Sequence, residues 1–419
     1  MTGFLGRDNT RAKHNQSAKI PLPAVNLAGL DNLNQPHLRS LSFDVQEYET
    51  RLRKVQAEMA RRDIDVLLCH TVAGICYLTG FESALWCKYT LAVVTREGAP
   101  ILLAQDFEMP NACATVWCDD WVTYPCHGDP IAATRDLLRA RGLDRLRLGI
   151  ELNRWSLSVP THQRLGEALA GCTLVDATAV MARVMRVKSS AEIAVIRQAA
   201  GLTSRGMSAA LDRVRSGVTD NDVAAAAYFQ LMEGGSEYMA VPPIVTVGAR
   251  SSIPHSTHRR VRIGAGESVL VEVGACVHRY STPCMRTVIT TPVPDLPRAM
   301  YEGCRASVTE VIRRIRPGVT GDEVAGHADK VIHEFSSQYV WHGIYGYSVG
   351  IGFPPDWNDT SAMIMRGSDL VLEAGMVFHV STSLRKVGTC GVAFSETVLV
   401  TATGAEALTD VPADLRITP

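Results

Sequence analysis

The sequence lacks the features that mark several large classes of protein. No apolar run approaches the about 20 residues that cross a bilayer, and the opening residues, MTGFLGRDNTRAKH, contain no apolar stretch typical of a signal peptide. There is no basic excess, because 42 Lys and Arg face 43 Asp and Glu. A nucleic-acid surface needs such an excess. We therefore expect a cytoplasmic protein that binds neither membrane nor nucleic acid.

Several catalytic and structural motifs are absent as well. The 11 cysteines form no CxxC pair, and an odd count without regular spacing predicts free thiols in a reducing compartment. There is no GxxxxGK[ST] phosphate loop and no strand–GxGxxG–helix unit. The sequence thus gives no support for nucleotide binding.

The chain is long enough for two or three domains. Residues 1–40 are polar and without periodicity, and we interpret them as an arm. Residues 41–185 alternate between helix and strand patterns, which predicts an α/β domain. Asp44 and Glu47 form a possible capping box before a helix whose buried face carries Tyr48, Leu52, Val55 and Met59. Strands are predicted at 64–69, 90–95, 100–104 and 146–151.

A second domain is predicted over residues 186–419, and it contains an internal repeat. Ser189 and Glu192 suggest a capping box before a long helix. RVRSGVTDNDVA (213–224) then matches RIRPGVTGDEVA (314–325), and each copy is followed by a strand pair. The matched strands place Glu272 and Ser381 at equivalent positions. We therefore expect a pseudo-twofold domain with a cleft where its two sheet halves meet.

Over roughly residues 40–419, the sequence resembles the creatinase, prolidase and aminopeptidase P superfamily. The resemblance rests on these halves and on two segments, RVMRVKSSAEIAVIRQAA (183–200) and SETVLVTATGAEALT (395–409). The resemblance implies a fold of class α/β (α+β), with an N-terminal creatinase-like domain and a C-terminal pita-bread domain. It also implies a homodimer in which the N-terminal domain contributes to the partner's cleft.

The sequence departs from that superfamily at its metal ligands. Metallopeptidase members hold two divalent metals with two Asp, one His and two Glu, and carboxylates can bridge such a pair. The corresponding positions here carry Glu272, Pro283, Tyr347, Ser381 and Ser395. One carboxylate cannot hold a dimetal centre. We therefore expect a metal-independent protein with no cofactor.

Within the metal-free branch, four segments resemble ectoine hydrolase, which opens a cyclic amidine: PHST (254–257), VEVGACVHRYSTPCMRTV (271–288), GYSVGIGFPPDW (346–357) and GMVFH (375–379). The rigid Pro-Pro pair of FPPDW predicts a fixed loop at the edge of the cleft. Two segments differ from that pattern, FESALWCKY (81–89) and STSLRKVGTCGVAF (381–394), where Arg385 and Lys386 occur. Both segments are expected to face the ligand.

Glu272 is the predicted catalytic base or nucleophile, because a carboxylate among apolar strand residues has its charged form disfavoured and can pair with a cationic amidinium. The alternative is a structural ion pair with a residue such as Arg286. His255 matches the histidine position used by creatinase and is the predicted acid/base partner; otherwise it is a hydrogen-bonded structural residue.

A further set of side chains is predicted to bind substrate, although each is also compatible with packing in the core or with a supporting role. They are Tyr280, Tyr347, His379, Glu396, Trp357 and Trp86. The resulting prediction is a hydrolase of a C–N bond in a small cyclic amidine: ectoine or 5-hydroxyectoine, opened to N-acetyl-diaminobutyrate. The alternatives are a creatinase-like hydrolase of another amidino or amide compound, a binding homologue without catalysis, and a residual Xaa-Pro metallopeptidase.

Overall fold

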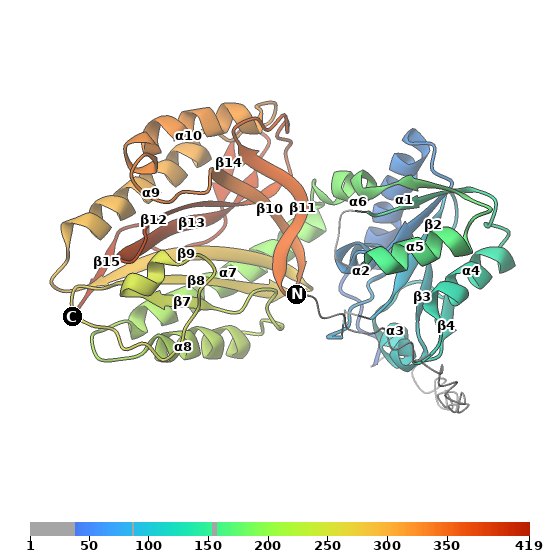
Figure 1. Ribbon diagram of the computed structural model, residues 1–419, viewed down its shortest axis with the longest axis horizontal. Helices are drawn as coiled ribbons and strands as arrows, with labels where there is room; N and C mark the ends of the chain where they lie inside the picture. Colours follow the sequence, from blue (N-terminus) through green and yellow to red (C-terminus); the bar gives the residue numbers. More distant parts are fainter. Residues whose placement is uncertain (1–37, 86–87, 153–156) are drawn as a thin grey trace, which may run out of the picture.

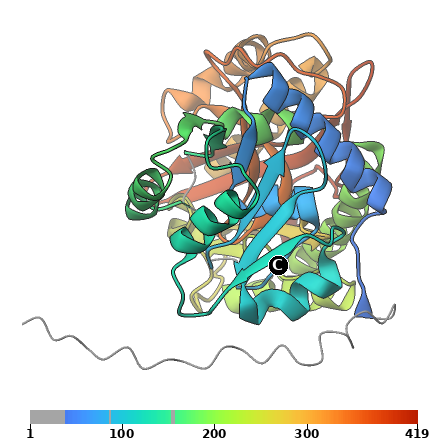
Figure 2. The same cartoon turned by 90° about the vertical axis from the view of Figure 1, so that its right-hand side faces the viewer.

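The computed structural model describes residues 38–419, apart from 86–87 and 153–156. Most of the arm expected at residues 1–40 therefore lies outside the described residues. Two domains lie side by side, joined through α6 (Thr178–Met185) and the start of α7 (Ser190–Arg213) (Figure 1). In Figure 2 the N-terminal domain stands in front of the C-terminal one. No helix in the described part of the chain is long and apolar enough to cross a membrane.

The N-terminal domain is a sheet with helices on both faces. Its strand order is β4-β3-β2-β1-β5-β6. Along β1, Leu67 and Cys69 pack with α1, α2 and α6, whereas Val66 and Leu68 pack with α4 and α5, as strand alternation requires. The elements are α1 (Val45–Arg61), β1 (Val66–Cys69), α2 (Val72–Thr79), β2 (Leu91–Thr95), β3 (Ile101–Gln105), η3 (Asp106–Glu108), α3 (Met109–Thr115), β4 (Trp121–Tyr124), α4 (Pro130–Ala140), β5 (Arg147–Ile150), α5 (Val159–Ala168), β6 (Thr173–Asp176) and α6 (Thr178–Met185).

One predicted helix start needs correction. The predicted helix exists as α1, and its expected face is buried. However, Asp44 makes no side-chain cap. Glu47 instead accepts hydrogen bonds from Arg51 Nε at 2.9 Å and from Ser189 Oγ at 2.8 Å. This glutamate ties α1 to the start of α7, so a long-range contact replaced the local capping box.

The C-terminal domain contains the expected repeat. Capping boxes at Ser189, Thr219 and Thr320 begin α7, α8 and α10. The pair α7–α8 precedes β8 and β9, and the pair α9–α10 precedes β12 and β13. The elements are α7 (Ser190–Arg213), α8 (Asp220–Glu233), β7 (Ile244–Val247), η4 (Gly248–Ser252), β8 (Ser268–Val277), β9 (Tyr280–Thr290), α9 (Asp295–Arg314), α10 (Gly321–Ser336), β10 (Ile344–Phe353), β11 (Asp356–Met365), β12 (Val377–Lys386), β13 (Cys390–Val400), β14 (Ala405–Ala407) and β15 (Arg416–Thr418).

The strands of both halves form one sheet, with the order β14-β13-β12-β10-β9-β8-β7 and with β11 paired to β10. All four long helices pack on one face of this sheet, where Val271 and Val273 meet α7 and α8, and Phe378 and Val380 meet α9 and α10. Along each strand, the side chains that alternate with these therefore point to the other face of the sheet. The predicted mixed α/β fold with a pseudo-twofold C-terminal domain is confirmed.

Candidate active site

The helix-free face of the large sheet gathers the residues that the resemblance aligns with the superfamily's metal ligands. Glu272 lies opposite Met285 of β9, and Ser381 lies opposite Ser395 of β13. The Met285 N–H donates to Ser395 Oγ at 2.6 Å, which joins the two halves of the sheet at this point. Strands from both repeats thus meet around one small area.

Glu272 is the buried acid of this area. The residue is 8% exposed, and its carboxylate makes no hydrogen bond or ion pair with any described residue. Burial raises its pKa from the ordinary 4.5 to about 7, and the positive charge of Arg385 opposes part of that rise. A carboxylate with this pKa can both accept and release a proton near neutral pH.

Arg385 supplies the positive charge that faces Glu272. It projects from β12, and its Nη1 donates to the Ser251 carbonyl at 2.9 Å. Burial lowers its pKa, and the attraction to Glu272 counteracts that effect. The alternative partner considered for Glu272, Arg286, is excluded by geometry, because its guanidinium is engaged by Glu396 on the helix-covered face.

Two histidines stand near Arg385. The His342 ring lies 4.5 Å from the Trp341 ring, and its Nδ1 accepts the Ile344 N–H at 3.1 Å. Loss of water around the ring, together with the charges of Arg385 and His255, lowers the pKa of His342 to about 4. His255 is exposed and has a left-handed backbone, with φ of 56°. It follows by four positions Ser251, the residue whose carbonyl accepts the hydrogen bond from Arg385.

A hydrogen-bonded network lies beside Glu272. Trp357 Nε1 donates to Tyr347 Oη at 2.9 Å, Tyr347 Oη is 2.7 Å from His379 Nδ1, and His379 Nε2 is 2.6 Å from Ser395 Oγ. Burial lowers the pKa of His379 to about 3, with a smaller contribution from His342. The imidazole is therefore neutral and carries one proton. If that proton is on Nδ1, the Tyr347 hydroxyl is free to donate towards Glu272. Burial, and to a smaller extent the charge of Glu272, raises the pKa of this tyrosine.

Trp357 occupies much of the space above the sheet. It is 4% exposed, and a Cβ added at Gly274 would meet its Cζ3 at 2.9 Å and the Pro283 Cα at 3.3 Å. The indole thus lies against the strand backbone where Pro283 replaces an aspartate. Gly274 is required here because any side chain would displace the ring.

Several predicted substrate-binding residues lie elsewhere. Tyr280 is 1% exposed and donates to Glu192 Oε1 at 2.7 Å, on the helix-covered side of β9. Glu396 faces the same side from β13, where it binds Arg286 and Thr409 rather than orienting His379. Both expectations were wrong because adjacent strand residues point to opposite faces. Trp86 lies outside the described residues.

The structure also identifies residues that the sequence argument missed or only approached. His342 was not considered, although it precedes Tyr347 by five positions. Arg385 was noticed only as a departure in its segment, yet it lies four positions after Ser381 and so on the same face of β12. Counting alternate positions along that strand would have identified it.

The described residues do not fit the dimetal centre of the metallopeptidases. Glu272 is the only carboxylate among the five corresponding positions, Pro283 has no donor atom, and the hydroxyls of Tyr347 and Ser395 are hydrogen-bonded within the protein. Over residues 38–419, apart from the two gaps, no group of three His, Cys, Asp or Glu side chains gathers in a way that could hold a metal ion.

Comparison with known proteins places this arrangement in a family. Residues 194–402 match metallopeptidase family M24, and residues 51–187 match the creatinase/prolidase N-terminal domain. An uncharacterized hydrolase/peptidase of Sinorhizobium fredii is 31% identical over 398 residues, covering 91% of this chain and all of the relative. The ectoine hydrolase of Halomonas elongata is 27% identical, covering 90% of this chain and 99% of the relative.

Among solved structures, a dipeptidase from Mycobacterium ulcerans superimposes with a TM-score of 0.78 at 21% identity, covering 90% of this chain and all of that one. This likeness supports the fold alone. The two family matches and the relative that aligns over its whole length lead to one conclusion: the chain belongs to the creatinase/prolidase group of metallopeptidase family M24, the hydrolases with the pita-bread fold.

Proposed function

We propose that this protein is a metal-independent hydrolase that opens the ring of a small cyclic amidine, with ectoine or 5-hydroxyectoine as the substrate. The observation that carries the proposal is the buried carboxylate of Glu272, which has no hydrogen-bonding partner among the described residues and faces Arg385. Such a group is costly unless a ligand compensates it. An amidinium cation is a suitable partner for it.

The arrangement of charge matches a zwitterionic substrate. An amidinium near Glu272 would leave a substrate carboxylate free to pair with the Arg385 guanidinium, which is a suitable bidentate donor. The 27% identity with an ectoine hydrolase over nearly the whole chain supports the same substrate class. The indole of Trp357 and the hydroxyl of Tyr347 would border the ring.

The chemistry can be balanced with the groups present. Glu272 takes a proton from water as the oxygen attacks the amidinium carbon. The resulting carboxyl group returns that proton to the departing ring nitrogen as the C–N bond breaks, and the hydroxyl proton of the tetrahedral intermediate passes to the released amine, so that an amide and an ammonium group form. In the alternative route the carboxylate attacks the amidinium carbon directly, the ring nitrogen takes up a proton and leaves as the C–N bond breaks, and water then cleaves the acyl imidate into the amide product and the free carboxylate. A single turnover in ¹⁸O-water separates the routes, because only direct attack followed by hydrolysis leaves label in the Glu272 side chain.

We propose that His255 and His342 shuttle protons between Glu272 and solvent. His255→Asn and His342→Asn should each lower turnover more than substrate binding. Equal losses in kcat and in kcat/KM, with KM unchanged, would fit this role.

The direct test is to follow ring opening by proton NMR with purified protein in the presence of EDTA. Ectoine, 5-hydroxyectoine, creatine and a Xaa-Pro dipeptide form the substrate panel. Glu272→Gln should abolish turnover, and Glu334→Gln, an exposed glutamate of α10, serves as the control that keeps it. Cleavage of the dipeptide only after added Mn²⁺ or Zn²⁺ would refute the proposal in favour of a peptidase. Ligand-induced thermal stabilisation without any turnover would indicate a binding protein.

We further propose that the protein acts as a homodimer. Exposed apolar side chains at Ile253, Val340 and Val387 lie with His255 and His342 around the β12–β13 turn, where Val340 pairs with Arg385 and the Gly388 N–H donates to Ser252 Oγ. Light scattering should give twice the mass of the chain, and Val387→Asp should weaken the association. A monomer at micromolar concentration would contradict this part of the proposal.

A further inference from the structure

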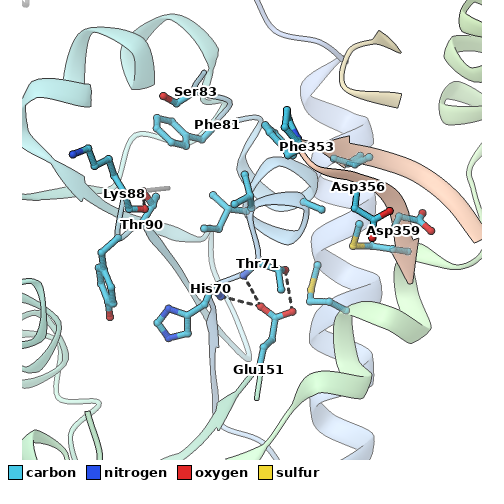
Figure 3. Close-up of a pocket in the computed structure, with 18 of the residues that line it drawn as sticks. His70, Thr71, Phe81, Ser83, Lys88, Thr90, Glu151, Phe353, Asp356 and Asp359 are labelled. Atoms are coloured by element: carbon cyan, nitrogen blue, oxygen red, sulfur yellow. Dashed lines mark hydrogen bonds between the residues drawn. The ribbon is translucent and has the colours of Figure 1, made fainter. Parts of the chain in front are cut away.

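A pocket of about 500 Å³ lies between the two domains, away from Glu272. Its walls come from α2 and the β2 region on one side, and from the β10–β11 turn on the other (Figure 3). The volume and the mixture of apolar walls with a few polar groups are typical of small-molecule sites. The comparisons assign no ligand to this pocket.

The β10–β11 hairpin separates this pocket from the candidate active site. Tyr347 and Trp357 face His379, whereas Phe353 and Asp356 line the interdomain pocket. The pocket is therefore a second compartment rather than an extension of the first. The FPPDW segment, expected only as an edge of the catalytic cleft, contributes to both.

His70 provides a polar group in this pocket that has no hydrogen-bonding partner. The residue is 3% exposed, and its Nε2 is buried without a partner among the described residues. Burial lowers its pKa to about 4, so the ring is neutral at pH 7. Nδ1 makes no hydrogen bond with a described residue either, and unlike Nε2 it is not fully enclosed by protein, so it is the ring nitrogen that a ligand group can reach.

The neighbouring Glu151 is not available to hydrogen-bond a ligand. Its carboxylate accepts from the His70 and Thr71 N–H groups, both at 2.9 Å, and from Thr71 Oγ1 at 3.0 Å. These bonds hold the start of α2 in place, as the dashed lines in Figure 3 show. Glu151 is saturated within the protein, whereas the imidazole of His70 is not.

The remaining charges make the pocket acidic. Among the described residues, only one oxygen of the Asp356 carboxylate has a partner: Oδ1 accepts a hydrogen bond from the Asn358 N–H at 2.9 Å. The Asp359 carboxylate is compensated by Lys188 Nζ at 2.8 Å. Lys88 is exposed, and in Figure 3 its amine lies on the side away from Asp356. Glu108 adds a further acid to the lining.

Aromatic side chains accompany these acids. Phe81 and Phe353 are 5% and 8% exposed, and both line the pocket. Aromatic faces beside a carboxylate favour cations over anions, because the ring faces carry partial negative charge. Apolar walls also require the bound cation to carry an apolar body.

We propose that this interdomain pocket binds a small organic cation, an ammonium or amidinium on an apolar body, whose charge pairs with Asp356 while its body packs against Phe81 and Phe353. A second polar group on the ligand hydrogen-bonds His70. The proposal does not depend on the hydrolase reaction, because none of these residues belongs to the candidate active site.

The test is isothermal titration calorimetry of the full-length protein with four probes that share one phenyl body. Phenethylammonium should bind saturably and at least about tenfold more tightly than neutral 2-phenylethanol or anionic 3-phenylpropionate. Tyramine, which adds a hydroxyl, should bind more tightly still, and His70→Phe should remove that additional affinity.

Asp356→Asn is the sharpest variant, because the amide oxygen can still accept the Asn358 N–H while the charge is lost. It should reduce phenethylammonium affinity about tenfold or more. Ala73→Phe, which places a ring in the pocket, should abolish binding. Glu272→Gln is the matched control and should bind the probe like the parent protein.

Three results would overturn the proposal: no saturable binding of any probe, binding of phenylpropionate as tight as that of the ammonium, or loss of binding in Glu272→Gln but not in Asp356→Asn. The last result would place the cation in the catalytic cleft. Failure of ectoine turnover would leave this test unaffected.

Discussion

The raised pKa of Glu272 predicts that the proposed catalytic group destabilises the fold. Its pKa is about 7 in the folded protein and about 4.5 when the group is free. The folded state therefore binds this proton more tightly than the unfolded state. Stability is highest below the unfolded pKa and falls as pH rises from about 4.5 to about 7. The difference between the two pKa values corresponds to about 3 kcal/mol at pH 8.

Glu272→Gln removes that ionisation while keeping the shape of the side chain. The variant should match the parent protein at pH 4.5 and exceed its unfolding free energy by up to about 3 kcal/mol at pH 8. This value already includes the attraction of Arg385, which acts on the carboxylate in the folded state. A gain in stability together with a loss of activity is typical of a residue retained for function.

The assay is urea unfolding of both proteins at pH 4.5, 6, 7 and 8, followed by fluorescence and by circular dichroism. Because the chain has two domains, coincidence of the two signals must be checked before a single free energy is quoted. The control is Glu334→Gln, whose curve should follow the parent at every pH. Parallel stability profiles for the parent and Glu272→Gln between pH 5 and 8 would refute the reasoning, since the carboxylate would then not be desolvated.

Three further predictions follow from the same geometry. The kcat/KM for the cyclic amidine should rise with pH through about 7, since the base form of Glu272 is required; a flat profile from pH 5 to 8 would contradict it. Arg385→Gln should raise KM for carboxylate-bearing substrates about tenfold or more. It should also raise the pKa of Glu272 further, which would shift that pH profile to higher pH; an unchanged profile would show that the charge of Arg385 does not act on Glu272. Gly274→Ala should displace the Trp357 ring, lowering activity and changing near-ultraviolet circular dichroism with intact far-ultraviolet signal; unaltered spectra and rates would show that the ring accommodates a methyl group.

The features of this fold that could be predicted from the sequence are those that local interactions determine. Apolar periodicity predicted α1 and several strands of the N-terminal sheet, and the capping residues Ser189 and Glu192 marked the start of α7. These signals depend on neighbours a few residues apart. The strands β4 and β6 were missed because most of their residues are only partly buried, so they lack the apolar run that marked β1 and β5.

The sequence by itself determined the repeat, the family and the replacement of the metal ligands, because matched segments and changed residue types are visible in the order of the chain. Only the tertiary structure decided which side chains share a face. The pairing of Val277 with Tyr280 fixes the register of β9 and turns Tyr280 towards α7. Register and domain contacts depend on residues far apart in the chain, so one position along β13 separates Ser395, beside the candidate site, from Glu396, which lies buried under the helices.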